Sequence, residues 1–280
     1  MSEGRRGGRV VEITSLANPL VKDIKALAQK RHREETGAFL AEGLKLVIDA
    51  LEQGWTIRTL AFAKAALGNA MIEKTAARAL AAGATVIEAS AKVLEAMTRR
   101  DNPQTVIAVF EQRFAVLKSF RAAGDDLYVA LDRVRDPGNL GTIIRTADAA
   151  GAKGVILIGE TTDPFGLETV RATMGSIFAL PVARASEAEF IAFAKDFDGL
   201  VVGTHLKGAV DYRKVGWAKK PVVLLMGNEQ QGLTEALAAA CSALARIPQA
   251  GRADSLNLAV ATGVMLFEAR RLALSLGNAT

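Results

Sequence analysis

Three polar loops contain the residue types best suited to chemistry, and each follows an apolar run that predicts a buried strand. Their sequences are RVRDPGNLG at 133–141, GNEQQGL at 227–233 and IPQAGRADSLN at 247–257. Amide, carboxylate, hydroxyl and guanidinium groups can hold and orient a polar substrate. The candidate catalytic residues are Asn139, Glu229, Ser255 and Asn257 in the loops, and Arg145 six residues after Asn139.

Each candidate also has a purely structural interpretation. Asn139 could cap a helix, and Arg145 could pair with a carboxylate three residues further on. Glu229 could lie in a solvated turn, and Ser255 could be a helix N-cap. Asn257 is less easily explained, because asparagine is unfavourable in a first helical turn and therefore suggests a specific partner.

The sequence around these loops lacks the nucleotide-binding glycine motifs. Gly138 and Gly141 do not have the spacing G-x-G-x-x-G, and the pattern G-x-x-x-x-G-K-[ST] does not occur. Dinucleotide-binding and P-loop folds are therefore disfavoured, and a nicotinamide-dependent oxidoreductase with them. Ligands of parallel α/β sheets nevertheless collect at the carboxyl ends of strands, where all three loops are expected.

Strands that alternate with helices predict a mostly parallel α/β sheet in the C-terminal half. The expected strands are 127–134, 154–159, 177–184, 200–206, 221–227 and 245–249. A long last helix is expected from about Ser255 to Leu276. This arrangement would place the polar loops at strand ends of one sheet.

The N-terminal half has the same alternation but not the polar loops. Strands are expected at 38–43, 56–63, 85–90 and 105–110, with helices at 43–54, 64–83 and 91–100. This part has no glycine-rich loop after a strand and no acid–base pair, which indicates a recognition or scaffold domain. Polar residues then break the alternation. We therefore predict a domain at 1–112, ordered from about residue 12, a linker at 113–126 and a second domain at 127–280.

A basic segment lies near the amino terminus. Asn18 and Pro19 predict the start of a helix that continues to about residue 30. The cationic residues crowded there are Lys22, Lys25, Lys30, Arg31 and Arg33. A solvated face and an RNA-contacting face are both open interpretations. The first ten residues are more simply a frayed tail than a phosphate-binding arm.

Composition restricts the partners and the compartment. The net charge of +5 and a pI near 9.4 suggest a polyanionic partner. The one cysteine, Cys241, cannot form an internal disulfide, which fits a reducing cytoplasm. With only two histidines the chain also lacks the ligands of a Cys/His zinc site, and no metal is expected. The apolar runs are shorter than a membrane helix, so no membrane partner is expected.

Taken together, the three loops resemble the signature motifs of the SpoU/TrmH branch of the SPOUT RNA methyltransferases. The matches are N-x-G-x-x-x-R at 139–145, G-N-E-x-x-G-L at 227–233 and I-P…S-L-N at 247–257. The resemblance covers about residues 127–275. The amino-terminal sequence ITSLANPLVKDIKAL…GAFLAEG is also similar to the substrate-binding extension of the family's rRNA-directed members.

The resemblance implies a small N-terminal α/β/α substrate-binding domain and a C-terminal parallel α/β domain with a trefoil knot, in a homodimer. It implies that S-adenosylmethionine binds in the knotted region, near Thr204, Gly227, Ile247 and Leu256. The catalytic pocket would then consist of Asn139, Arg145, Glu229, Ser255 and Asn257.

The implied reaction transfers a methyl group from S-adenosylmethionine to a ribose 2′-hydroxyl of RNA. The resemblance nominates Arg145 as the main catalytic residue, a residue often described in this family as the base. A guanidinium is effectively always protonated, however. We therefore favour Arg145 as a clamp on the adjacent phosphate, with Glu229 holding Arg145 or the hydroxyl network.

The resemblance indicates the type of reaction more clearly than the type of RNA that is the substrate. The additional N-terminal domain favours ribosomal RNA, with transfer RNA as the alternative. A non-catalytic RNA-binding protein with the same fold is a further alternative, which the intact polar loops disfavour. The methylated nucleotide is not identified by the sequence.

Overall fold

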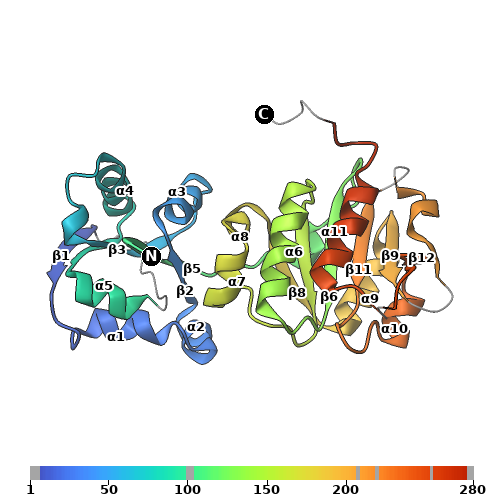
Figure 1. The fold of residues 1–280 in the computed structure, drawn as a ribbon, viewed down its shortest axis with the longest axis horizontal. Helices are drawn as coiled ribbons and strands as arrows, with labels where there is room; N and C mark the ends of the chain where they lie inside the picture. The colour runs from blue at the N-terminus through green and yellow to red at the C-terminus, as the bar shows by residue number, and fades with distance from the viewer. Residues whose placement is uncertain (1–6, 99–103, 206–208, 218–220, 253–254, 276–280) are drawn as a thin grey trace, which may run out of the picture. The chain divides into compact units, whose positions relative to one another are not determined.

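The computed structural model describes residues 7–98, 104–205, 209–217, 221–252 and 255–275 (Figure 1). Contacts within the chain divide it into two compact units. The first unit comprises Met1–Gln112 and Phe165–Ala179, and the second comprises Arg113–Pro164 and Leu180–Thr280. The segment 165–179 therefore leaves the second half of the sequence and packs within the first unit.

In the described residues of the first unit, a five-stranded mixed sheet forms the centre. Its strands are β1 (Arg9–Ile13), β2 (Ala38–Glu42), β3 (Ile57–Ala63), β4 (Thr85–Ala89) and β5 (Val106–Glu111). Their order is β1-β4-β3-β5-β2. Strands β1, β3 and β4 run parallel, whereas β5 is antiparallel to both β3 and β2. The mostly parallel sheet expected here is thus interrupted by β5.

Helices cover both faces of this first sheet. They are α1 (Pro19–Ala26), α2 (Lys30–Thr36), α3 (Leu44–Glu52), α4 (Ala70–Ala81) and α5 (Ala91–Met97). Helices α3 and α4 lie on one face, and α1 and α5 lie on the other (Figure 1). Asn18 caps α1 as expected, because its Oδ1 accepts a hydrogen bond from the backbone N–H of Leu20 at 2.9 Å.

The helix expected to continue to about residue 30 is broken. Helix α1 ends at Ala26, and α2 begins at Lys30. Arg33 of α2 is 5% exposed, and its Nη1 donates to the carbonyl oxygens of Leu27 and Ala28 at 2.8 and 3.0 Å. The expectation that Arg33 contacts RNA is therefore corrected: its guanidinium is buried and satisfies carbonyls at the end of α1.

The segment 165–179 completes an aromatic cluster of the first unit. It forms α7 (Leu167–Ala172) and α8 (Ser176–Ala179). The indole Nε1 of Trp55 donates to the carbonyl oxygen of Phe178 at 2.8 Å. The packed rings are those of Phe39, Trp55, Phe110, Phe165 and Phe178. Helix α8 occupies the first part of the strand expected at 177–184, which corrects that prediction.

In the described residues of the second unit, a seven-stranded sheet is parallel throughout, as expected for the C-terminal half. Its strands are β6 (Leu127–Asp132), β7 (Gly154–Ile158), β8 (Val182–Ala185), β9 (Leu200–Thr204), β10 (Val210–Asp211), β11 (Val222–Met226) and β12 (Ala243–Arg246). Their order is β10-β12-β9-β11-β6-β7-β8. Strands β6, β7 and β11 are buried along their whole length, so their apolar runs are continuous rather than alternating.

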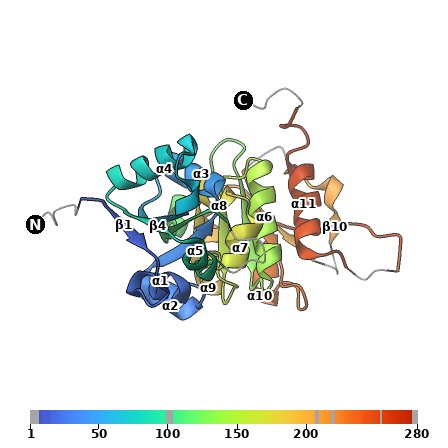
Figure 2. The ribbon, with the colours of Figure 1, turned by 60° about the vertical axis from the view of Figure 1, so that its left-hand side comes forward.

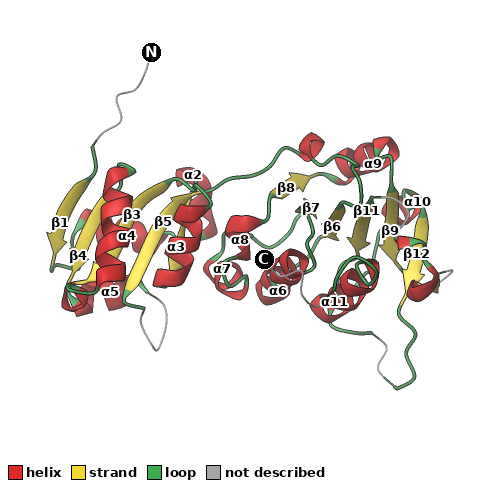
Figure 3. Cartoon of the chain, turned by 90° about the horizontal axis from the view of Figure 1, so that it is seen from above, coloured by secondary structure: helices red, strands yellow, loops and turns green. Residues whose placement is uncertain are grey.

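Four helices of the second unit flank this sheet in the described residues: α6 (Pro137–Ala149), α9 (Glu187–Asp196), α10 (Glu235–Ala239) and α11 (Leu258–Ala269). Helices α6 and α11 pack side by side, as Figure 2 shows. They lie on one face of the sheet, and α9 and α10 lie on the other (Figure 3). None of the helices in the described part of the chain has both the length and the apolarity to cross a bilayer.

Residues 113–126 pack on the second sheet rather than crossing open space as a linker. The backbone N–H of Ala115 donates to the carbonyl oxygen of Val182 at 2.8 Å. Phe120 is buried, and its ring lies 5.2 Å from the ring of Tyr128 on β6, centroid to centroid. The segment thereby covers the end of the sheet beside β7 and β8.

Candidate active site

The carboxyl ends of four neighbouring parallel strands form the candidate site. These strands lie in the order β12-β9-β11-β6. Thr204 ends β9, Gly227 follows β11, and Ile247 follows β12. The polar loops therefore leave the same edge of the sheet, which is where parallel α/β sheets bind ligands.

The first loop begins α6 with Asp136 as the N-cap. The Oδ1 of Asp136 accepts a hydrogen bond from the backbone N–H of Asn139 at 2.6 Å, and Pro137 occupies the first helical position. Asn139 is therefore not the cap of this helix. Its side chain is left to interact with the other two loops.

Asn139 and Asn257 join the first and third loops. The Nδ2 of Asn257 donates to the Oδ1 of Asn139 at 2.9 Å. The Oδ1 of Asn257 accepts from the backbone N–H groups of Ala259 and Val260 at 2.9 and 3.2 Å, so Asn257 is the N-cap of α11. The specific partner expected for Asn257 is thus Asn139. The last helix was expected to begin at about Ser255. Its first residue is Leu258, and its N-cap is Asn257 rather than Ser255.

Glu229 joins the second loop to the first. Its carboxylate accepts from the backbone N–H groups of Arg135 and Asp136 at 3.4 Å and from the Nδ2 of Asn139 at 3.5 Å. These contacts place a negative charge at the amino end of α6, which the helix dipole favours. They also complete a chain of hydrogen bonds that runs from Asn257 through Asn139 to Glu229.

The second loop is held in a tight turn. The Oδ1 of Asn228 accepts from the backbone N–H groups of Gln230 and Gln231 at 3.0 and 3.1 Å. A Cβ at Gly227 would lie only 2.5 Å from backbone atoms of Gly232 and Leu233, so glycine is required at this position. Glu229 lies within this turn, directly after Asn228.

Arg145 is exposed on α6, and no hydrogen bond or ion pair engages it within the described part of the chain. Six residues separate it from Asn139, about 9 Å along the helix axis at about 1.5 Å per residue. Glu229 does not hold Arg145 here, since its contacts are to Asn139 and the helix start. That part of the expected network is corrected, and the guanidinium remains exposed.

The remaining site residues surround these loops without being joined to them. Ser255 is exposed just before Asn257, and Leu256 is 38% exposed. Thr204 and Ile247 are half-buried, and Gly227 is buried. A ligand at the strand ends would therefore meet both backbone groups and partly exposed apolar side chains.

Two residues of the site were not assigned a role from the sequence. Asp136 sets the start of α6, and the Asp-Pro pair at an N-cap and first helical position could have indicated this. Asn228 shapes the second loop by accepting a hydrogen bond from the backbone two residues further on. Asparagine often forms turns in this way, so an asparagine directly after a strand could have indicated the turn.

The sole cysteine is an unreactive thiol rather than a nucleophile. Burial raises the pKa of Cys241 to about 11, and its Sγ donates to the carbonyl oxygen of Leu237 at 3.2 Å. In the described residues, no group of three or more His, Cys, Asp and Glu side chains could hold a metal ion.

The basic segment of the first unit keeps four of its five cationic residues on the surface. Lys22, Lys25, Lys30 and Arg31 are exposed. Lys30 and Arg31 lie 3.8 and 2.7 Å from Glu34 and Glu35, so part of their charge is neutralised locally.

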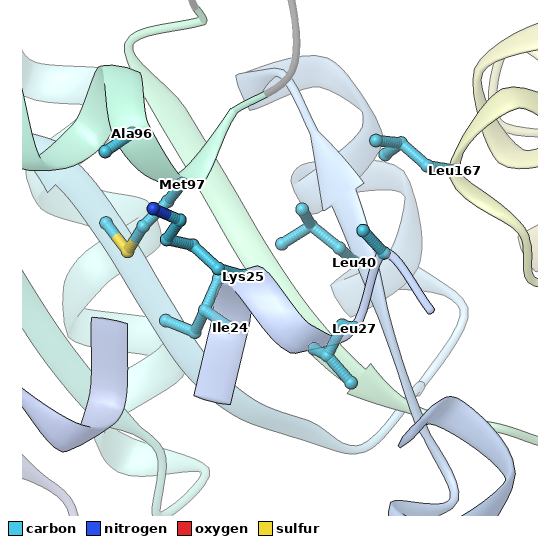
Figure 4. Close-up of a pocket in the computed structure, with 8 residues that line it drawn as sticks. Ile24, Lys25, Leu27, Leu40, Ala96, Met97 and Leu167 are labelled. Atoms are coloured by element: carbon cyan, nitrogen blue, oxygen red, sulfur yellow. The ribbon is translucent and has the colours of Figure 1, made fainter. Parts of the chain in front are cut away.

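A small pocket lies beneath α1 in the first unit (Figure 4). Its volume of about 10 Å³ is close to the space of one water molecule. Its lining residues are Ile24, Lys25, Leu27, Ala28, Leu40, Ala96, Met97 and Leu167. This pocket is too small for a nucleobase or for S-adenosylmethionine, so it does not compete with the strand-end site.

The fold is that of an α/β protein in which three hydrogen-bonded polar loops meet at the carboxyl ends of a parallel sheet. The model of the SpoU rRNA Methylase family matches residues 126–267, and that of the MRM3-like substrate binding domain matches residues 18–108. The chain belongs to the SpoU rRNA methylase family, as the three motifs predicted.

Curated relatives match along nearly the whole chain. One is the 23S rRNA (uridine(2479)-2'-O)-methyltransferase of Streptomyces viridochromogenes, 35% identical over 100% of this chain and 98% of the relative. Another is the 23S rRNA (guanosine(2553)-2'-O)-methyltransferase of Bacillus subtilis, 32% identical over 92% of this chain and 99% of the relative. A crystal structure of an AdoMet-bound rRNA methyltransferase from Sinorhizobium meliloti is 62% identical, with a TM-score of 0.91 and coverage of 95% and 99%.

Proposed function

We propose that this chain transfers a methyl group from S-adenosylmethionine to a ribose 2′-hydroxyl of RNA, with ribosomal RNA as the substrate class. The main support is the chain of hydrogen bonds from Asn257 through Asn139 to Glu229, which joins the three family motifs at the strand ends. Two relatives that match along nearly the whole chain are 23S rRNA 2′-O-methyltransferases, and this favours the same reaction here.

Four residues at the strand ends would hold the cofactor: Thr204, Gly227, Ile247 and Leu256. Adjacent backbone groups at the ends of β9, β11 and β12 suit the polar parts of S-adenosylmethionine, and the partly exposed Ile247 and Leu256 suit its apolar parts. When bound, the cofactor supplies an electrophilic methyl group. The Sinorhizobium meliloti relative binds AdoMet in its crystal structure, which supports the same cofactor here.

Asn139 and Asn257 would orient the ribose. Because the Oδ1 of Asn139 accepts from Asn257, its Nδ2 must face Glu229, and the orientation of the amide is fixed. Ser255, exposed beside Asn257, adds a hydroxyl that can contact the ribose or the cofactor. Holding the 2′-oxygen in line for displacement is the main requirement of this reaction.

Arg145 would bind the phosphate next to the reacting ribose and stabilise the negative charge that develops on the 2′-oxygen. Its guanidinium stays protonated and therefore cannot remove the hydroxyl proton. That proton would leave to a phosphate oxygen or to water. Removing one preorganised charge partner of this kind typically lowers the rate by about 10²–10³.

The exposed cations of α1 and α2 would dock the RNA. Lys22, Lys25, Lys30 and Arg31 lie within the region that matches the MRM3-like substrate binding domain. Their charge suits a phosphate backbone, which supplies most of the sequence-independent affinity for nucleic acids.

We further propose that the chain works as a homodimer through α11. This helix is apolar apart from Thr262 and Glu268, and its Val260 and Phe267 are 54% and 48% exposed. Large exposed apolar side chains on one helix are typical of a protein interface.

The trefoil knot and a cytoplasmic location belong to the same proposal. The knot is implied by the family, and the cytoplasm by the single unpaired cysteine.

A methyl-transfer assay with two RNA arms tests the function. The purified protein is incubated with methyl-labelled S-adenosylmethionine and with either ribosomal or transfer RNA that lacks modifications. We expect label to enter ribosomal RNA. Label in transfer RNA alone would favour the alternative substrate, and cofactor binding without label in either RNA would favour a non-catalytic RNA-binding protein.

A further inference from the structure

We infer that Arg133 is a positioning residue that holds the loop 227–232, and with it Glu229, against the start of α6. Its consequence for catalysis rests on the methyl transfer proposed above, whereas the contact itself is a property of the fold. Arg133 lies directly after β6 and belongs to none of the three family motifs.

The backbone of Arg133 is held in an unusual conformation. Its φ of 48° lies in the left-handed region, which residues with a Cβ rarely adopt. Its N–H donates to the carbonyl oxygen of Ile158 at 3.0 Å, and its own carbonyl accepts from the Nδ2 of Asn228 at 2.8 Å. The first polar residue of the loop is therefore tied to this backbone.

The side chain of Arg133 connects β6 to the other end of the same loop. Its Nε and Nη2 donate to the two carboxylate oxygens of Asp132 at 2.9 and 2.8 Å, and that carboxylate is only 1% exposed. Its Nη1 donates to the Oε1 of Gln231 at 2.8 Å, and its Nη2 reaches the carbonyl oxygen of Gly232 at 3.4 Å. The planar guanidinium thus binds a buried anion and the loop at once.

Gly159 leaves space for the side chain of Arg133, and Asp132 favours the charged form of its guanidinium. A Cβ at Gly159 would lie 3.3 Å from the Cγ of Arg133, so a side chain there would press on the arginine stem. The hydrogen bond to Asp132 raises the pKa of Arg133, and a guanidinium is effectively always protonated in proteins.

Glu229 depends on these contacts because its own contacts are long. The distances from its carboxylate to the N–H groups of Arg135 and Asp136 and to Asn139 are 3.4–3.5 Å, at the outer limit of a hydrogen bond. By contrast, Arg133 contacts Asn228 and Gln231 at 2.8 Å on either side of Glu229. The contacts of Arg133 with Asn228 and Gln231 therefore hold the Glu229 carboxylate in place.

Arg133→Gly tests the inference without adding backbone strain, because glycine adopts a left-handed φ freely. We expect kcat to fall by about 10–10², the loss typical of a misplaced catalytic group, with the KM values for RNA and cofactor nearly unchanged. Arg133→Lys keeps the charge but loses the fork, and should recover part of kcat. Gln231→Ala removes only one acceptor and should reproduce a smaller part of the loss.

Two measurements separate positioning from a general loss of stability. In the Glu229→Gln background, Arg133→Gly should lower kcat little further, because both changes act through one carboxylate. Amide hydrogen exchange of residues 228–232 should rise in Arg133→Gly and stay at the wild-type level in Arg58→Ala. Arg58 is the matched control, since it also donates to a carboxylate and a carbonyl, those of Glu111 and Thr36, away from the loop.

The outcomes distinguish this inference from the proposed function. A wild-type protein that methylates no RNA contradicts the function, and the hydrogen-exchange comparison then still decides whether Arg133 holds the loop. Unchanged exchange in Arg133→Gly overturns the inference, as does a kcat equal to wild type or a fully additive effect with Glu229→Gln. If Arg133→Gly does not fold, Arg133→Lys and Gln231→Ala provide the same comparison.

Discussion

Asn257 makes two kinds of contact with one amide group. Its oxygen caps α11, and its nitrogen donates to Asn139. Aspartate caps helices as well as asparagine does but has no N–H to donate. Substitution can therefore separate the cap from the contact with Asn139.

Asn257→Asp should keep the melting temperature and lower kcat by about 10–10², because the orientation of Asn139 is lost. Asn257→Ala should lose the cap as well, at about 1 kcal/mol, which lowers the melting temperature by about 2–4 °C. Thermal melts and methyl-transfer kinetics of both variants check this. Equal kcat values for Asn257→Asp and the wild type would show that the contact with Asn139 is not used.

Arg145→Ala should abolish methylation, with a loss of at least about 10²–10³ in rate. The cofactor should bind the variant nearly as well as the wild type, because Arg145 lies on α6 and is not one of the proposed cofactor residues at the ends of β9, β11 and β12. Calorimetry with S-adenosylmethionine and the RNA assay measure the two effects separately. Methylation at close to the wild-type rate would remove Arg145 from the mechanism.

The proximity of three candidate site residues could be predicted from the sequence because they lie in motifs with fixed spacing. Asn139, Glu229 and Asn257 were predicted to meet, and hydrogen bonds join them. The role of Arg133 could not be predicted, because a left-handed backbone at an arginine leaves no mark in the sequence. The burial of Arg33 could not be predicted either. Its guanidinium binds carbonyl oxygens that become available where α1 ends and α2 begins, and the periodicity of the sequence does not show this break.

Among the elements, the buried strands were the most predictable. Strands β6, β7 and β11 are continuous apolar runs, and the structure has them within two residues of the expected ends. Strand β1 is not predicted by the sequence, because it is short and two of its five residues, Arg9 and Glu12, are charged. The sequence predicts a strand where helix α8 lies, since a short apolar run fits a strand and a buried helix equally well.

Among the helices and strands, α1 and α2 should contribute most to RNA affinity, because they carry the exposed cationic residues of the basic segment. Reversing Lys22, Lys25 and Arg31 to glutamate should weaken RNA binding and flatten its dependence on salt, because fewer counterions are released. Binding is measured by titration at several salt concentrations. The matched control reverses Lys45, Lys74 and Arg78, which lie on α3 and α4 on the opposite face of the sheet. Equal affinities for the two triple variants would contradict this docking surface.

At the scale of the whole molecule, the exposed apolar face of α11 predicts self-association. Phe267→Glu should convert a dimer into a monomer, since a charge would be buried at the interface. Light scattering coupled to size-exclusion chromatography measures the mass. Met71→Glu is the control, because Met71 is similarly exposed, at 52%, on α4 of the first unit. A monomeric wild-type protein, or a dimeric Phe267→Glu variant, would contradict an interface through α11.

The chemical form of the product tests the central claim most directly. Ribosomal RNA methylated by this protein is digested to nucleosides, and the modified nucleoside is identified by mass spectrometry together with its resistance to alkaline cleavage. A methyl group on the ribose 2′-oxygen, absent from the product of Asn139→Ala, is the predicted result. A methyl group on a base, or the same ribose mark made by Asn139→Ala at an undiminished rate, would contradict a ribose-methylating site built from these three loops.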